Sequence, residues 1–243
     1  MEKETIVKSN QRVKDHGEVF TPKCVVNEML NQDGIRQAAE SLTSTFLEPS
    51  AGEGAFLVEL LKRKTSAAVQ LSETHKELGE NMLQGLSTVY GIELLEDNME
   101  LLVMNLILEF STLYGEYSRD LFNQQVDKDV INSAKTIIRA NMVQGNSLTK
   151  LNDKGEPMIF SEWEALPVKY GVRKVQRTEY TFDAILSGGD STVTQKPKED
   201  EEIDLLAGFF EDEIEPGDPE PVLMKFVPVK WSELWQESIE GNL

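Results

Sequence analysis

The apolar and polar positions of this chain alternate between two patterns. Short apolar runs, typical of buried strands, are separated by longer segments whose apolar residues recur every three or four positions, as in helices. The strand-like runs are residues 44–47 (STFL), 88–92 (TVYGI) and 141–144 (NMVQ). The helix-like segments are residues 55–64, the second half of 65–85, 96–114 and 126–139. Strands that alternate with helices predict an α/β domain with a parallel sheet.

A polar arm and a short helical segment are expected before the first strand. Residues 1–16 are polar and carry no clear apolar stripe. Thr21 followed by Pro22 is a good helix start, because a hydroxyl can cap the helix and proline suits its first turn. A second short helix is expected over residues 35–41, after the interruption at Gly34.

The pattern changes toward the C-terminus. Residues 157–163 and 173–182 look extended and are separated by a turn at Tyr170 and Gly171, which predicts a β-hairpin. Residues 182–186 (FDAIL) read as a further strand. A basic cluster in this region could meet nucleic acid or an acidic partner, although a charged edge strand is the favoured interpretation. Its members are Lys169, Arg173, Lys174 and Arg177.

The remaining segments are read from their composition. Residues 187–221 are expected to be a flexible acidic linker, because a run rich in glycine, serine and threonine leads into many acids. Residues 203–210 carry apolar positions at near-helical spacing, which leaves a docking helix and a disordered tail as open alternatives. Residues 222–243 form an amphipathic C-terminal segment that packs on this domain or on a partner. Its apolar face consists of Trp231, Leu234, Trp235 and Ile239.

The net charge of −19 limits what the chain can bind by itself. A protein that grips DNA alone needs clustered Lys and Arg against the phosphates. Residues 196–221 hold eleven acids against two lysines, and the rest of the chain is still acidic. Autonomous DNA binding is therefore not expected, unless a basic partner provides the grip.

Cysteine usage and hydropathy bear on the compartment. The single cysteine, Cys24, excludes an internal disulfide and a cysteine-based zinc cluster, which suits a reducing cytosol. No apolar run approaches the roughly 20 residues that span a bilayer, and the N-terminal residues lack a signal-peptide pattern. We therefore expect a cytoplasmic protein without a membrane anchor or a metal. His75 stands alone among polar residues and is expected to be a solvated surface residue.

The candidate chemistry lies between the first strand and the helix that follows it. Residues 48–54 (EPSAGEG) break the strand pattern, and helical spacing resumes at Ala55. A strand, a glycine loop and a helix form the geometry that binds a nucleoside-bearing cofactor. The glycines let the backbone approach the ligand, and the helix N-terminus presents unpaired N–H groups.

Three further segments of the sequence help to interpret this loop. Residues 17–22 (GEVFTP) precede it. Residues 90–98 (YGIELLEDN) follow it as a short apolar strand that ends in an acid, Glu93, and residues 142–148 (MVQGNSL) as another short strand that ends in a polar turn. In this order the segments resemble the cofactor-binding motifs of S-adenosylmethionine-dependent DNA methyltransferases. The likeness is to gamma-class adenine-specific enzymes and to the M subunits of type I restriction-modification systems. It implies a Rossmann-like methyltransferase fold over residues 17–186, with a helical segment at the N-terminal end of this range and an acidic C-terminal extension.

The resemblance also assigns roles to residues around S-adenosylmethionine. Phe20 and Thr21 match the aromatic-Thr-Pro segment, which in the family closes over the methionine end of the cofactor. In the glycine loop, Glu48 would hydrogen-bond the amino-acid portion, while Gly52 and Gly54 give room. The other matched loop residues are Pro49, Ser50 and Ala51.

Two further matches concern the adenosine. Glu93 would accept hydrogen bonds from both ribose hydroxyls, because one carboxylate can accept two bonds at once. Asn146 and Ser147 match the turn that contacts the adenine edge, although the family often has Asp at the first of these positions.

The catalytic motif is where the resemblance fails. Adenine methylation in the family relies on Asn-Pro-Pro-Tyr, or a close variant, after the fourth strand. Its polar groups hold the exocyclic amine of the base, and its aromatic residue stacks on the flipped base. Here residues 187–191 read SGGDS, with no asparagine, proline or aromatic residue in the matching positions. No catalytic residue can therefore be assigned.

Three hypotheses follow. In the first, the chain is an S-adenosylmethionine-binding subunit of restriction-modification type, and a partner chain supplies the catalytic motif and the DNA-reading surface. In the second, it is a non-enzymatic interaction protein that kept the fold and uses its acidic tail against a partner's basic groove. In the third, it methylates a protein or a small molecule, for which the missing motif is not required.

Overall fold

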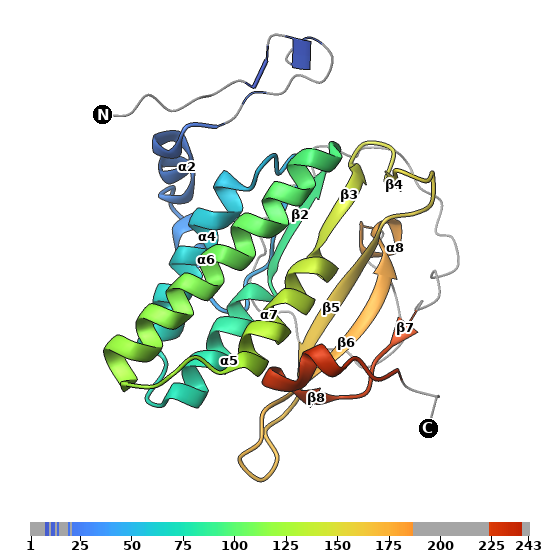
Figure 1. The fold of residues 1–243 in the computed structure, drawn as a ribbon. Helices are drawn as coiled ribbons and strands as arrows, with labels where there is room; N and C mark the ends of the chain where they lie inside the picture. Colours follow the sequence, from blue (N-terminus) through green and yellow to red (C-terminus); the bar gives the residue numbers. More distant parts are fainter. Residues whose placement is uncertain are drawn as a thin grey trace.

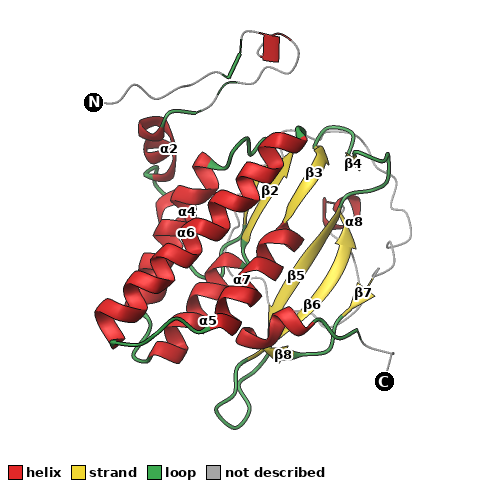
Figure 2. Cartoon of the chain, viewed as in Figure 1, coloured by secondary structure: helices red, strands yellow, loops and turns green. Residues whose placement is uncertain are grey.

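The computed structural model describes residues 8, 9, 11, 12, 14, 19, 21–186 and 224–239. It is a mixed α/β structure built on a parallel sheet, with helices gathered on one side of β2 and β3 (Figures 1 and 2). Among the described helices, none is both long and apolar enough to cross a bilayer.

The three expected strands form the parallel sheet. They are β1 (Phe46–Glu48), β2 (Val89–Glu93) and β3 (Met142–Asn146), in the order β1-β2-β3. The short β4 (Leu151–Asn152) adds antiparallel to β3. Because all three parallel strands run the same way, the loops that follow them meet at one edge of the sheet. The α/β fold class with a parallel sheet is therefore confirmed.

Three helices pack against one face of this sheet, namely α4 (Ala55–Gln70), α6 (Glu96–Phe122) and α7 (Lys128–Asn141). The helix α5 (His75–Leu86) packs against these helices. Side chains pack closely around Gly91 of β2. An added Cβ there would stand 2.8 Å from Leu57 of α4 and 2.9 Å from Met142 of β3. Alternate residues of β2 face the other way, and Ile92 belongs to a second cluster with Met158 and Phe160.

Between residue 21 and β1, the chain forms two short helices, α2 (Lys23–Leu30) and α3 (Ile35–Ala39), as the pattern predicted. The expected cap is wrong in detail. Pro22 occupies the N-cap position of α2, and no side chain caps this helix, so Thr21 stands one residue too early to do so.

A second, antiparallel sheet follows the parallel one. Its strands are β5 (Ile159–Ala165), β6 (Lys174–Thr181), β7 (Met224–Lys225) and β8 (Val229–Lys230). The predicted hairpin is confirmed, since β5 pairs with β6, and Tyr170 and Gly171 have positive φ angles of 52° and 72° in the turn between them. Asn141 of α7 ties the sheets together. Its amide accepts from the Trp163 ring at 2.8 Å and donates to the Val89 carbonyl at 3.1 Å.

The segment that was expected to be a further strand is a helix, α8 (Phe182–Leu186). The amide of Ala184 donates to the Thr181 hydroxyl, which favours a helical turn directly after β6. Phe182 then packs against Phe160 in the second cluster. Alternation alone could not distinguish these five residues from a strand.

Two members of the basic cluster, Lys174 and Arg177, lie on β6, and the other two precede this strand. The cluster is therefore not on an edge strand, because β6 pairs with β5 on one side and with β7 and β8 on the other. Its arginines have intramolecular partners. Arg173 donates to Asn81 and Gln84 of α5, and the Arg177 guanidinium lies 4.4 Å from the Phe226 ring. The Arg173 contacts hold the second sheet to α5, whereas the Arg177 contact joins β6 to the residue after β7 within that sheet.

His75 is also not the solvated residue expected from its surroundings. It is half-buried at the start of α5, and its Nε2 lies 2.9 Å from the Ser118 hydroxyl and 3.2 Å from the Tyr114 hydroxyl. Its ring stacks on that of Tyr114. The three side chains tie α5 to α6.

The C-terminal apolar face is divided in the structure. Residues Trp231–Gln236 form a 3₁₀ helix, η1, and not an amphipathic α-helix. Trp231 and Leu234 are buried in the main core, whereas Trp235 remains exposed. This part of the segment therefore packs on its own domain, which is one of the two positions expected from the sequence. The predicted linker at 187–221 and its apolar positions at 203–210 lie outside the described residues.

Candidate cofactor-binding site

The glycine loop connects β1 to α4 in a conformation that needs its glycines. Gly52 and Gly54 have φ angles of 54° and 90°, in the left-handed region that other residues rarely adopt. A Cβ on Gly54 would also stand 2.5 Å from Leu102 of α6. The Ala51 amide donates to the Ile92 carbonyl at 2.9 Å, which fastens the loop to the end of β2.

A cavity of about 670 Å³ lies between this loop, the start of α4 and the segment around α2. Thr21, Lys23 and Met29 line it on one side, and Phe56 and Lys62 of α4 line it on the other. The predicted loop residues that face it are Glu48, Ser50, Ala51 and Gly52. Its volume falls in the range of small-molecule sites, so the loop borders a space that can hold a ligand.

Glu48 supplies a carboxylate to this cavity. Burial raises the pKa of the Glu48 carboxyl above its ordinary value, and the opposing contact is the Ser50 amide at 3.3 Å. Because the charged form loses solvation here, a positively charged ligand group beside it would be favoured. The α-ammonium of an amino acid is such a group.

Glu93 lies behind the loop. Its side chain is 6% exposed and is not among the residues that line the cavity. One carboxylate oxygen accepts from the Gly52 amide at 2.7 Å, and the other accepts from the Leu95 amide at 3.0 Å and from Asn98 at 3.4 Å. A carboxylate has about four acceptor positions, so one remains for a ligand hydroxyl. The structure thus brings Glu93 to the glycine loop, as a support of it.

The third strand ends beside a smaller cavity of about 280 Å³, which Asn146 lines together with Leu94 and Asp153. The Asn146 side-chain oxygen is already occupied, because it accepts from the amides of Leu148 at 2.9 Å and Thr149 at 3.4 Å. A contact from this side chain to a ligand would therefore come from its amide nitrogen.

The other predicted residues take less direct positions. Ser147 follows Asn146 in the turn, but it does not line the cavity there. Pro49 and Gly54 shape the loop without facing the larger cavity. Phe20 lies outside the described residues, although its neighbours Val19 and Thr21 both line that cavity.

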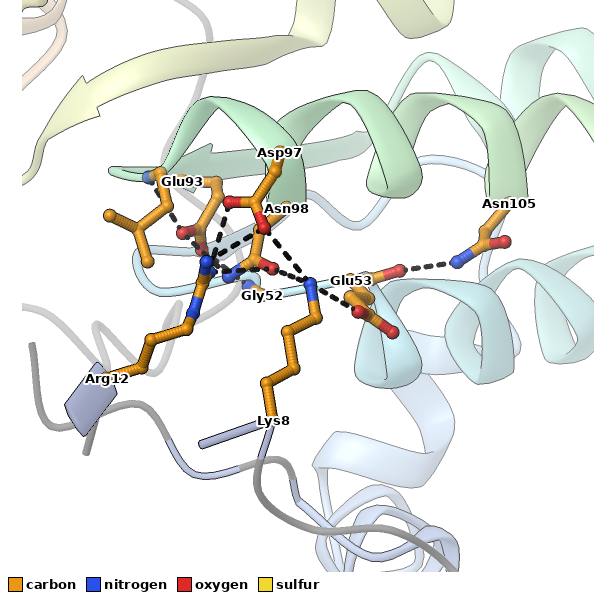
Figure 3. A network of polar contacts seen from close by, with 9 residues as sticks. Lys8, Arg12, Gly52, Glu53, Glu93, Asp97, Asn98 and Asn105 are labelled. Atoms are coloured by element: carbon orange, nitrogen blue, oxygen red, sulfur yellow. Dashed lines mark hydrogen bonds and ion pairs between the residues drawn. The ribbon is translucent and has the colours of Figure 1, made fainter. Parts of the chain in front are cut away.

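Sequence reasoning missed a polar network at the rim of the site (Figure 3). Lys8 of the N-terminal arm contacts Glu53 at 2.7 Å, and Arg12 contacts both carboxylate oxygens of Asp97, at 2.9 and 3.0 Å. The hydrogen bond from Arg12 holds the pKa of the Asp97 carboxyl below its ordinary value. Asn98 joins the network from the first turn of α6. A polar side chain amid an apolar helical pattern was the available signal for Asn98, and the arm gave none beyond its charges.

The described residues contain no group of three or more His, Cys, Asp or Glu side chains arranged to hold a metal ion. The groups they do bring together suit an organic cofactor. They offer a glycine-lined cradle, a partly buried carboxylate for an ammonium and a second, polar cavity at the end of β3.

A parallel sheet with a glycine loop after its first strand and a buried acid at the end of its second defines a class of α/β proteins that bind nucleoside-bearing cofactors. Within that class, the chain belongs to the N-6 DNA methylase family, whose model matches residues 4–139. The resemblance seen in the sequence is thereby confirmed at the level of the family. Neither the curated proteins nor the solved structures contained a match to the chain.

Proposed function

We propose that the chain binds S-adenosylmethionine in the cavity beside the glycine loop and serves as the cofactor-binding part of a DNA adenine methyltransferase. The observation that carries this proposal is the position of Glu48 at the wall of a 670 Å³ cavity that Gly52 also lines. The methionine ammonium would pair with Glu48, and the loop backbone would approach the methionine portion. When bound, the cofactor supplies an electrophilic methyl group.

The adenosine would extend from this cavity along the edge of the sheet toward β3. Glu93 has one acceptor position left, which suits one ribose hydroxyl while the carboxylate continues to hold Gly52. Asn146 would meet the adenine edge through its amide nitrogen, because its oxygen already accepts two backbone hydrogen bonds. The proposed roles of Phe20, Thr21 and Ser147 are those that the family resemblance implies.

The same proposal gives the catalytic step to a partner chain. In the usual order of a doubly wound sheet, the fourth strand lies next to the first, on the side away from the second. Among the described residues, β1 pairs with β2 alone, and residues 182–186 form α8. A partner strand carrying Asn-Pro-Pro-Tyr could therefore add to the outer edge of β1.

Charge supports the same division of labour. The net charge of −19 opposes a direct grip on DNA phosphates, and the arginines of the basic cluster are engaged within the chain. We propose that DNA meets this protein through the partner, as in the M subunits of type I restriction-modification systems or split gamma-class enzymes.

Titration calorimetry with S-adenosylmethionine tests the cofactor assignment. The wild type should bind one molecule per chain, and Glu48→Gln should weaken binding at least tenfold, because it removes a partly buried charge beside a cationic group. Glu116→Gln is a matched control, because this exposed acid lies on α6 away from the glycine loop. Equal affinities in all three proteins, or no binding to the wild type, would contradict the assignment and favour a non-enzymatic interaction protein.

A methylation assay tests the division of labour. The purified chain with labelled cofactor and DNA should transfer no methyl groups, although it binds the cofactor. Robust methyl transfer to DNA by the pure chain would refute the need for a partner. Labelling of a protein or a small molecule in a cell extract would instead support another substrate class.

A further inference from the structure

We propose that Lys8 and Arg12 are positioning residues, which clasp the N-terminal arm onto the cofactor site and slow the exchange of the bound cofactor. This inference rests on the proposed function. It concerns residues outside the motifs that the resemblance assigned, and its evidence is the network drawn in Figure 3.

The clasp connects segments that are far apart in the sequence. The Lys8 ammonium lies 2.7 Å from Glu53 of the glycine loop and 3.4 Å from Asp97 at the start of α6. Arg12 holds Asp97 with two parallel hydrogen bonds of 2.9 and 3.0 Å. Bidentate pairs of this kind fix orientation as well as distance. Lys8 and Arg12 thereby connect the arm to the glycine loop and to the start of α6.

Asn98 links Lys8 and Arg12 to Glu93, which lies behind the glycine loop. Its side chain is 1% exposed, and its oxygen accepts from Lys8 at 2.6 Å and from Arg12 at 3.4 Å. Its amide nitrogen donates to Glu93 at 3.4 Å, and Glu93 in turn accepts from the Gly52 amide at 2.7 Å. A continuous chain of hydrogen bonds thus runs from the arm to the glycine loop.

The position of Lys8 relates this network to the ligand. Lys8 lines the 670 Å³ cavity together with Glu48 and Gly52, so this residue of the arm forms part of the wall of the proposed ligand site. The loop is also held from the other side, since Asn105 of α6 donates to the Glu53 carbonyl at 2.9 Å. Releasing the arm would therefore loosen one of several supports of the loop.

The strength of the contacts favours a kinetic role over a structural one. The side chains of Lys8 and Arg12 are each 27% exposed, and Asp97 is 52% exposed. Ion pairs with this exposure contribute little to folding and weaken in salt. A contact of that strength alters a dissociation rate by a small factor, roughly two- to fivefold, and leaves the fold intact.

A charge swap tests the clasp. Dissociation of tritiated S-adenosylmethionine from the full chain is measured by rapid filtration for the wild type, Arg12→Asp, Asp97→Arg and the double variant. Each single variant should release the cofactor roughly two- to fivefold faster, and the double variant should restore the slow rate. In the wild type, release should accelerate as salt increases, and this dependence should weaken in Lys8→Ala/Arg12→Ala.

A control and a second readout keep the outcomes distinct. Arg119 and Asp120 form an exposed ion pair at 2.8 Å at the far end of α6, so Arg119→Asp should leave release unchanged. In the cofactor-free protein, hydrogen exchange of the Gly52 amide should be faster in Arg12→Asp and restored in the swap. Equal exchange in these proteins, or equal release rates, would overturn the clasp. Absence of cofactor binding combined with the expected exchange pattern would instead refute the proposed function and retain the clasp.

Discussion

Lys64 provides the most quantitative prediction, because a lysine buried in the helical layer must influence stability through its charge. It lies on α4 with 1% of its surface exposed, and its ammonium donates to the carbonyls of Ser41 at 2.7 Å and Ser44 at 2.8 Å. The Phe46 ring centre lies 5.3 Å away. Burial lowers the pKa of Lys64 from 10.5 to about 7.

The sign of the effect follows from proton binding. The unfolded chain keeps the ordinary lysine pKa, so between pH 7 and 10.5 it binds one more proton at this residue than the folded chain does. The free energy of unfolding therefore rises with pH in this window, by about 1.4 kcal/mol per pH unit from Lys64 alone. At and below pH 7 the full penalty applies, on the order of 5 kcal/mol.

Lys64→Met removes the charge and keeps most of the apolar stem. Its effect near pH 7 is a balance, because losing the penalty is opposed by leaving two carbonyls without a donor, at about 1–3 kcal/mol each. The slope is the clearer measure. From pH 7.5 to 9.5, the unfolding free energy of the variant should rise less steeply than that of the wild type, by about 1.4 kcal/mol per pH unit.

Urea unfolding followed by tryptophan fluorescence at several pH values measures this slope. Lys62→Met is the control, because Lys62 stands on the same helix, is 35% exposed and lies 3.6 Å from Glu109. Other titrating groups contribute equally to both proteins, so only the difference in slope counts. Parallel curves for the wild type and Lys64→Met would refute the reasoning.

Three further substitutions test other parts of the structure by urea unfolding. Gly54→Ala should destabilise by about 1–3 kcal/mol and weaken cofactor binding, because φ is 90° and Leu102 blocks a Cβ; unchanged stability would show that the loop can rearrange. Asn141→Ala should cost about 2–4 kcal/mol, since it leaves the Trp163 ring N–H and buried carbonyls unpaired, and a loss below 1 kcal/mol would contradict this. Thr74→Ala should cost about 1 kcal/mol, because Thr74 forms a capping box at α5, whereas Thr74→Ser should retain stability.

The elements with strong local signals could be predicted from the sequence. The strands β1, β2 and β3 are short apolar runs, and the helices between them show clear helical spacing. Boundaries were less accurate. The helix α6 extends to Phe122, well past residue 114 where the expected helix ended, because its last eight residues mix exposed polar positions with partly buried ones. Local periodicity thus gave the order of elements and underestimated their length.

Features decided by distant contacts could not be read locally. Residues 182–186 became α8 because the chain turns after β6 and Phe182 joins the second cluster. The central position of β6 depends on β7 and β8, which lie more than 40 residues later in the chain. His75 found its partners on α6, 39 and 43 residues away. In each case the deciding partner is remote in the sequence.

In the candidate site too, features with a local sequence signal could be predicted, and features that depend on distant contacts could not. The glycine loop and Glu48 were identified from consecutive residues, and the structure places Glu48 at the cavity. The support role of Glu93 was not foreseen, because it depends on the Gly52 amide, 41 residues away. Lys8 and Arg12 reach Asp97 across 89 and 85 residues. Charge composition alone gave no reason to place the arm there.

Hydrogen exchange of the full chain, measured with and without S-adenosylmethionine, locates the ligand most directly. If the cofactor binds beside the glycine loop, its addition should slow exchange in peptides that cover residues 48–54 and 93–98, and leave the β5–β6 hairpin unaffected. Protection confined to another region, or no protection at saturating cofactor, would contradict the assignment of this cavity.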